Sequence, residues 1–84
     1  MTDVSVDHPF DQQLDARELA CPLPLLKAKQ VISGMQVGQV LWLLATDAGS
    51  QRDIRRYAEL SGHILEASET FDGEFHYWLR KSGD

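Results

Sequence analysis

The spacing of apolar residues changes several times along the first half of the chain, and each change predicts a new element. The short segment 12–17 predicts a strand, and residues 18–20 follow it as a loop. From Pro22 the sequence PLPLLKAKQVIS has helical spacing up to Gly34, a residue type that commonly ends helices. The run VLWLLAT, 40–46, is rich in strand formers and too short for a capped helix. It therefore predicts a strand covered on at least one face.

The second half of the chain repeats the alternation of helix and strand. The segment DAGSQRD, 47–53, resembles a turn that enters a helix, and Ser50 with Asp53 has the spacing of a capping box with a weaker acid. Gly62 supplies the predicted end of this helix, and residues 63–70 predict a strand. The helix positions that share one face are Ile54, Tyr57, Ala58 and Ser61.

A hairpin completes the predicted fold. Asp72-Gly73 is a turn dipeptide typical of β-hairpins, and residues 74–81 alternate as a strand does. Phe75, Tyr77 and Leu79 are predicted on one face, and His76, Trp78 and Arg80 on the other.

The order of these elements predicts the fold class. A β-α-β-α-β-β order is typical of a two-layer α/β sandwich, with two helices on one face of a four-stranded sheet. The first two strands are expected to be parallel and the hairpin antiparallel, so the sheet is mixed. We expect one domain at 12–82 and a flexible polar arm at 1–11.

Composition and charge limit the classes of function that this chain can have. The 84 residues include 13 acidic and 8 basic side chains, a net charge of −5, which disfavours direct binding to nucleic acid. No apolar run is long enough to span a membrane, and the N-terminus has no signal-peptide pattern. The one cysteine forms no internal disulfide, so we expect a cytoplasmic protein with a reduced thiol. A lone cysteine with scattered histidines has no metal-ligand spacing, and we expect neither metal nor cofactor.

The cysteine lies in the segment ACPLP, 20–24. If the helix begins at Pro22, then Pro22 and Pro24 lie in its first turn, where proline is tolerated. Cys21 would then be the N-cap, and the helix dipole would lower the pKa of its thiol. Arg17 and Lys27 would add positive charge if they point toward it. The alternative is a small buried hydrophobic residue with no chemistry.

The residues leave few reactions for a reactive thiol. A second, resolving cysteine is absent from the sequence, and no spacing links His8, His63 or His76 to Cys21 as in a Cys-His hydrolase. The remaining chemistry is the acceptance and donation of a group, and a persulfide suits it.

The sequence resembles the TusA-like (SirA/TusA) sulfurtransferases. The matching segments are LDARELACPLPLLKAK at 14–29, ATDAGSQRD at 45–53, SGH at 61–63 and the DG hairpin. The resemblance implies the same sandwich and a Cys21 persulfide that relays sulfur. It implies a donor such as a cysteine desulfurase or rhodanese and a downstream acceptor protein, with the carrier a monomer or weak dimer. Transfer RNA thiolation, molybdenum-cofactor sulfuration and sulfur oxidation are the implied pathways.

The resemblance also singles out residues around the cysteine. Asp15 matches an acid before the motif, assigned to loop structure or to the polarity of the sulfur site. Asp47 matches an acid after the second strand, for which a turn or cap role is favoured. Arg17 and Lys27 are electrostatic supports, partner contacts or solvated charges. Many family members have glycine where this chain has Glu18, and a glutamate does not easily adopt a positive φ.

Trp42 and Trp78 form a separate candidate surface. The predicted strand faces place both on the side of the sheet that the helices leave uncovered. Exposed aromatic residues there would mark a site for a partner or a second copy. Alternatively, the two indoles pack against each other and against residues 1–11.

Two further function classes remain open. In the first, the domain is a non-catalytic interaction or regulatory module, and Cys21 has no chemical role. In the second, Cys21 is a redox-sensing thiol that is oxidised and then reduced again.

Overall fold

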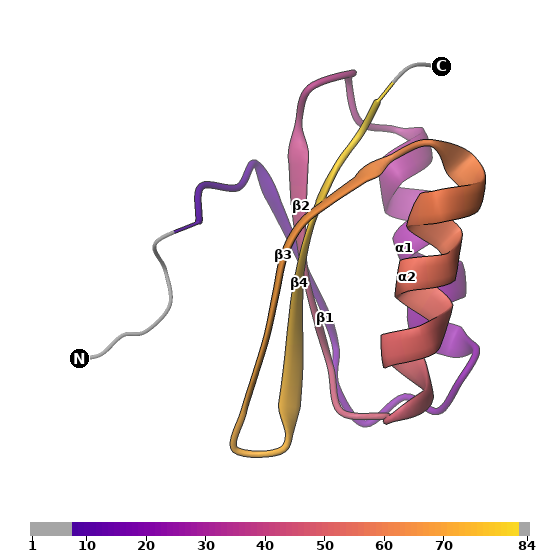
Figure 1. Ribbon diagram of the computed structural model, residues 1–84, viewed down its shortest axis with the longest axis vertical. Helices are drawn as coiled ribbons and strands as arrows, with labels where there is room; N and C mark the ends of the chain where they lie inside the picture. The colour runs from indigo at the N-terminus through magenta and orange to yellow at the C-terminus, as the bar shows by residue number, and fades with distance from the viewer. Residues whose placement is uncertain (1–7, 83–84) are drawn as a thin grey trace.

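A mixed four-stranded sheet forms one layer of the molecule, and two helices form the other (Figure 1). The structure is a computed structural model and describes residues 8–82. This architecture confirms the predicted two-layer sandwich. The elements in chain order are β1 (Gln12–Ala16), α1 (Leu23–Ser33), β2 (Val40–Ala45), α2 (Gly49–Ser61), β3 (Ile64–Phe71) and β4 (Glu74–Arg80).

The strands lie in the order β1-β2-β4-β3. β1 and β2 are parallel, whereas β4 is antiparallel to both β2 and β3, as predicted for the first pair and for the hairpin. The parallel pair brings the C-terminal end of β1 beside that of β2, so the loops that follow these strands meet at one edge of the fold. These loops carry Cys21 and Asp47.

The core lies between the helices and one face of the sheet. Alternate residues of β2 and β4 point into it, and the helix residues Ala28, Ile32, Ile54 and Ala58 pack against them. The strand residues in this core include Leu41, Leu43, Ala45, Tyr77 and Leu79. Gly62 has φ +86°, a left-handed conformation that ends α2 as predicted. Neither helix is long and apolar enough to cross a membrane, and no other helix occurs within residues 8–82.

The other face of the sheet carries the two tryptophans. Trp42 and Trp78 are cross-strand partners whose rings stack at 5.8 Å, with Phe10 against Trp42 and His8 against Trp78. Trp78 is 1 % exposed and Trp42 is half-buried, so the second of the two alternatives is observed, in which the indoles pack against each other and against residues before β1. Their mutual stacking and the segment before β1 bury Trp78 fully and Trp42 in part. A role for this face in partner binding stays a prediction.

The segment before β1 lies on the side of the sheet away from the helices (Figure 1). The arm predicted at 1–11 falls partly outside the structure, because residues 1–7 are not among those described. At its other end, Asp11 already pairs with β2. Its N–H donates to the carbonyl of Val40, and its carboxylate accepts from the Val40 N–H, both at 2.8 Å.

Candidate functional site

The cysteine does not cap α1 as the sequence predicted. Helix α1 begins at Leu23, and Pro22 is its N-cap, whose carbonyl accepts from the Leu26 N–H at 3.0 Å. Pro24 is buried in the first turn, where a missing N–H costs nothing. Cys21 therefore lies one residue before the cap, exposed, and the Cys21–Pro22 peptide bond is cis.

The thiol lies against the first turn of α2 instead. A Cβ atom on Gly49 would lie 3.4 Å from Cys21 Sγ and 3.3 Å from its Cβ. It would also lie 2.9 Å from a carboxylate oxygen of Asp47, which accepts from the Gly49 N–H at 2.9 Å. Glycine is thus what allows the cysteine loop to approach this helix so closely. Asp47 thus closes the turn before α2, which is one of the two roles, turn or cap, favoured from the sequence, and Ala48 is the N-cap.

Asp53 is the direct partner of the thiol. Cys21 Sγ donates a hydrogen bond to Asp53 Oδ2 at 2.6 Å, and the Asp53 side chain is 19 % exposed. The predicted capping box of Ser50 with Asp53 is wrong, because the N-cap of α2 is Ala48, two residues before Ser50. Ser50 is buried, and its hydroxyl bonds the Tyr77 hydroxyl at 2.8 Å. This bond ties the first turn of α2 to β4.

Charge around the thiol favours its protonated form. The hydrogen bond to Asp53, then partial desolvation, and then the charges of Asp53 and Asp47 raise the pKa of the Cys21 thiol. Arg52 opposes them. The sequence predicted a lowered pKa, and that prediction is wrong because two carboxylates at the start of α2 outweigh the helix dipole there.

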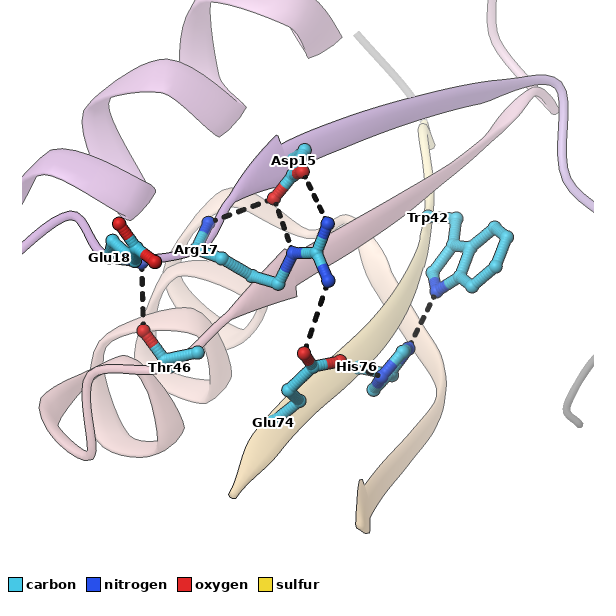
Figure 2. A network of polar contacts seen from close by, with 7 residues as sticks. All are labelled: Asp15, Arg17, Glu18, Trp42, Thr46, Glu74 and His76. Atoms are coloured by element: carbon cyan, nitrogen blue, oxygen red, sulfur yellow. Dashed lines mark hydrogen bonds and ion pairs between the residues drawn. The ribbon is translucent and has the colours of Figure 1, made fainter. Parts of the chain in front are cut away.

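The cation that acts on the thiol is Arg52 and not Arg17 or Lys27. Figure 2 shows the Arg17 guanidinium between two carboxylates, donating to Asp15 at 2.8 and 2.9 Å and to Glu74 at 3.1 Å. The bonds from Arg17 lower the pKa of Asp15 to about 2. Asp15 thus fixes the end of β1 through Arg17, and the prediction that Arg17 supports the thiol is wrong. Lys27 is an exposed residue of α1.

Glu18 adopts the conformation that glycine would adopt more easily. Its φ is +70°, and its N–H donates to the Thr46 hydroxyl at 2.8 Å (Figure 2). This bond joins the loop after β1 to the end of β2 and offsets part of the cost of the left-handed backbone. The cysteine loop therefore keeps its turn without glycine.

Sequence reasoning missed three residues of the site: Gly49, Arg52 and Asp53. All three lie in or next to the segment ATDAGSQRD that carried the family resemblance. Nothing in the spacing showed that Asp53, 32 positions after Cys21, contacts its sulfur, because this contact depends on how α2 packs beside the loop.

A shallow hollow of about 270 Å³ between the helices opens beside Asp53. Its lining is mostly apolar, with Leu25, Tyr57 and Leu60 next to Lys29 and Arg56. Across residues 8–82, no group of three or more His, Cys, Asp or Glu side chains is arranged to hold a metal ion. The polar groups at the site itself are a thiol, a carboxylate and nearby guanidinium groups.

Known proteins resemble this chain over nearly its whole length. A family model described as "Sulfurtransferase TusA" matches residues 12–81. The "Sulfur carrier protein TusA" of Allochromatium vinosum is 47 % identical over 73 residues, which cover 87 % of this chain and 96 % of that protein. The protein of the same description from Pseudomonas syringae pv. syringae is 38 % identical, covering 88 % of each.

A solved structure shows the same fold. The crystal structure of a SirA-like protein from Desulfitobacterium hafniense superposes with a TM-score of 0.76 at 23 % identity, covering 87 % of this chain and all of that one. Together with an exposed cysteine in a Cys-Pro-x-Pro segment, these matches show that the chain belongs to the TusA family of sulfur carrier proteins.

Proposed function

We propose that Cys21 accepts a sulfane sulfur as a persulfide and passes it on to an acceptor protein. The observation that carries this proposal is the exposed Cys21 thiol, whose proton is directed at the Asp53 carboxylate at 2.6 Å. An exposed sulfur admits another protein's persulfide, and an adjacent carboxylate accepts the proton that the thiol must lose.

Loading is a transfer between two sulfur atoms with no net oxidation. The proton of Cys21 passes to Asp53, and the thiolate attacks the outer sulfur of the donor persulfide. A new bond forms between Cys21 Sγ and that sulfur, and the sulfur–sulfur bond of the donor breaks. The donor leaves as a thiolate, which takes up a proton, so atoms and charge balance.

Release of the sulfur is favoured by the same carboxylate. A persulfide is a stronger acid than a thiol, so the loaded Cys21 is more readily anionic than the free one. Asp53 and Asp47 repel that anion, as they repel the thiolate. In unloading, a thiolate of the acceptor attacks the outer sulfur and bonds to it, while the bond between Cys21 Sγ and that sulfur breaks. Cys21 leaves as a thiolate, which takes back a proton and the hydrogen bond to Asp53. The site is therefore suited to a carrier that loads and then unloads.

The partners and the pathway follow from the family resemblance. A cysteine desulfurase or a rhodanese is the expected donor, and the acceptor belongs to transfer RNA thiolation, molybdenum-cofactor sulfuration or sulfur oxidation. The acidic chain would act on RNA through its acceptor rather than by direct contact. We expect it to work in the cytoplasm, as a monomer or weak dimer.

The raised pKa of the thiol weighs against the redox-sensor alternative. Sensor cysteines are thiolates with lowered pKa values, often next to a resolving cysteine. Here Asp53 raises the pKa of Cys21, and the sequence has one cysteine. The interaction-module alternative predicts that the thiol is dispensable.

Intact-mass spectrometry tests the proposal. The natural protein and Cys21→Ser are incubated with a cysteine desulfurase and cysteine, or with inorganic polysulfide. We expect a gain of one sulfur atom on the natural protein alone, removed by a thiol reductant. Serine has nearly the same size, so the variant should keep its fold, which circular dichroism checks. If no donor adds sulfur to the natural protein, the interaction module becomes the better explanation.

A further inference from the structure

Charge is divided unevenly between the two layers of the molecule. The whole chain has 8 basic and 13 acidic residues, but α1 and α2 together carry five basic and two acidic residues. The helical layer is thus positive on a protein of net charge −5. An uneven field of this kind orients an approaching charged surface toward one side of the molecule.

Three arginines of α2 form the densest part of this positive layer. Arg52, Arg55 and Arg56, here called the arginine stripe, are exposed at helical spacings of three and four residues. They line a hollow of about 450 Å³ together with Gln51 and Glu59. Like charges at such spacings weaken a helix. Among residues 8–82, Arg55 and Arg56 form no ion pair.

The other arginines show what an engaged guanidinium looks like in this chain. Arg17 binds Asp15 and Glu74, and Arg80 binds Glu66 and the Gly38 carbonyl. Both fasten strands and loops of the sheet layer. The arginine stripe makes no such contacts to the strands and loops of the sheet layer. Its guanidinium groups nevertheless present several donors that suit bidentate binding of carboxylates.

The arginine stripe begins beside the thiol. Arg52 is 3.8 Å from the carboxylate of Asp53, which accepts the hydrogen bond of Cys21, and its side chain is 81 % exposed. When Cys21 is loaded, negative charge develops on the departing sulfur of the donor, outside this chain. When Cys21 is unloaded, charge develops on its own sulfur beside Asp53. Arg52 lowers the pKa of Cys21, so it stabilises the thiolate that attacks the donor during loading as well as the thiolate released during unloading.

We infer that the arginine stripe docks an acidic surface of the protein that donates sulfur to Cys21. This inference rests on the proposed function and adds the chemistry of the partner. Carboxylates of the donor bind Arg55 and Arg56, and this contact brings the donor's persulfide to the exposed sulfur at the start of α2. Nucleic acid is the weaker occupant, because the rest of the chain is strongly acidic and would repel an extended phosphate backbone.

The test compares loading by a protein donor with loading by a small donor. Arg55→Gln with Arg56→Gln removes two positive charges from the stripe and leaves Cys21, Asp53 and Arg52 in place. The matched control, Gln12→Glu with Gln13→Glu, makes the same net-charge change on exposed residues of β1. Loading rates are measured with a cysteine desulfurase, with a rhodanese and with inorganic polysulfide, at low and high salt.

We expect the arginine variant to load from its protein donor roughly tenfold more slowly at low salt, through a raised KM. High salt should narrow this difference, because it screens exposed charges. Polysulfide should load the natural chain and both variants equally, and the control should behave as the natural chain does with every donor.

Several results would overturn the inference. One is an equal loss in the control, since net charge alone would then explain it. Another is an equal loss with polysulfide, since the thiol itself would then be disturbed. A third is loading of the natural chain by polysulfide but by neither protein, which leaves the proposed function standing. A single-stranded RNA that binds the natural chain but not the arginine variant would assign the stripe to nucleic acid. If no donor loads the natural chain, the proposed function itself fails.

Discussion

Asp15 and Asp53 are both aspartates of the site region, and they differ in what they bind. Asp15 belongs to an arginine-bridged cluster with Arg17 and Glu74, in which one guanidinium joins two carboxylates (Figure 2). Asp53 belongs to a thiol cluster with Cys21 and Arg52, in which the short contact is to a neutral thiol and the cation lies 3.8 Å away.

The difference separates a structural cluster from a reactive one. In the arginine-bridged cluster, opposite charges lower the pKa of Asp15 to about 2, so it stays ionised and holds the end of β1. In the thiol cluster, the carboxylate raises the pKa of Cys21 and has no comparable cation at close range. A partner that adds or removes charge there changes the state of the thiol. Arg17 is closer to Cys21 in sequence than Arg52 is, but Arg52 is the arginine that acts on the thiol. Proximity in sequence therefore does not determine which arginine acts on the cysteine.

The largest expected effect comes from breaking the support beneath the thiol cluster. Tyr77→Phe leaves the Ser50 hydroxyl buried without its partner, because the two groups bond at 2.8 Å and both residues are almost fully buried. We expect the free energy of unfolding to fall by about 1–3 kcal/mol. Urea unfolding followed by tryptophan fluorescence measures this change.

Ser50→Ala should cost a similar amount, and the double variant should cost less than the two single losses added together, because both remove one interaction. Tyr57→Phe is the matched control and should change stability little. Its hydroxyl has no hydrogen bond to any other residue in 8–82. Fully additive losses would show that the Ser50–Tyr77 bond does not anchor α2.

The next effect sharpens the difference between the two aspartates. Asp53→Asn removes the carboxylate that raises the pKa of Cys21, so more thiolate is present at neutral pH. We expect alkylation of Cys21 by iodoacetamide at pH 7 to become several-fold faster. The pH at which the alkylation rate is half-maximal should fall. Asp15→Asn should leave both unchanged. A midpoint in Asp53→Asn equal to that of the natural protein would contradict the role given to this carboxylate.

The sequence predicted the fold better than the site. Strand and helix periods, Gly62 and the Asp72-Gly73 turn depend on local geometry, which neighbouring residues largely determine. The start of α1 shifted by one residue and the start of α2 by two, and at Cys21 the shift of one residue changed the meaning of the position. An N-cap cysteine faces the donors of its own helix, whereas Cys21 lies before the cap and faces α2.

The contacts of the site were beyond the sequence because they join distant segments. Arg17 is four residues from Cys21 in sequence, but the strand geometry of β1 places it against Asp15 and β4 places Glu74 within its reach. Asp53 reaches the thiol through the packing of α2 beside the loop. Trp78 was placed on the correct face, and its packing against Trp42 and the segment before β1 was one of two alternatives that the sequence left open.

A smaller effect is expected from the cation of the thiol cluster. Arg52→Gln removes the one charge that lowers the pKa of Cys21 against the carboxylates. Because the Arg52 side chain is 81 % exposed, water screens much of its influence, and alkylation at pH 7 should slow only modestly. Arg17→Gln should leave the alkylation rate as it is. If Arg17→Gln slowed it more than Arg52→Gln, the two clusters would have been assigned to the wrong arginines.

The smallest effect lies in the arginine-bridged cluster itself. Arg17→Ala removes the bonds that lower the pKa of Asp15 to about 2, so this pKa should return toward the ordinary value of about 3.9. A depressed carboxyl pKa contributes stability above the ordinary value and loses it as the pH falls toward about 2. As the pH falls from about 3.9 to about 2, the free energy of unfolding of the natural protein should therefore decrease slightly more than that of Arg17→Ala. The loss is small because both side chains are about half exposed. Carboxyl-detected NMR titration measures the pKa directly, and an unchanged value in Arg17→Ala would mean that Arg17 does not hold Asp15 in its ionised form.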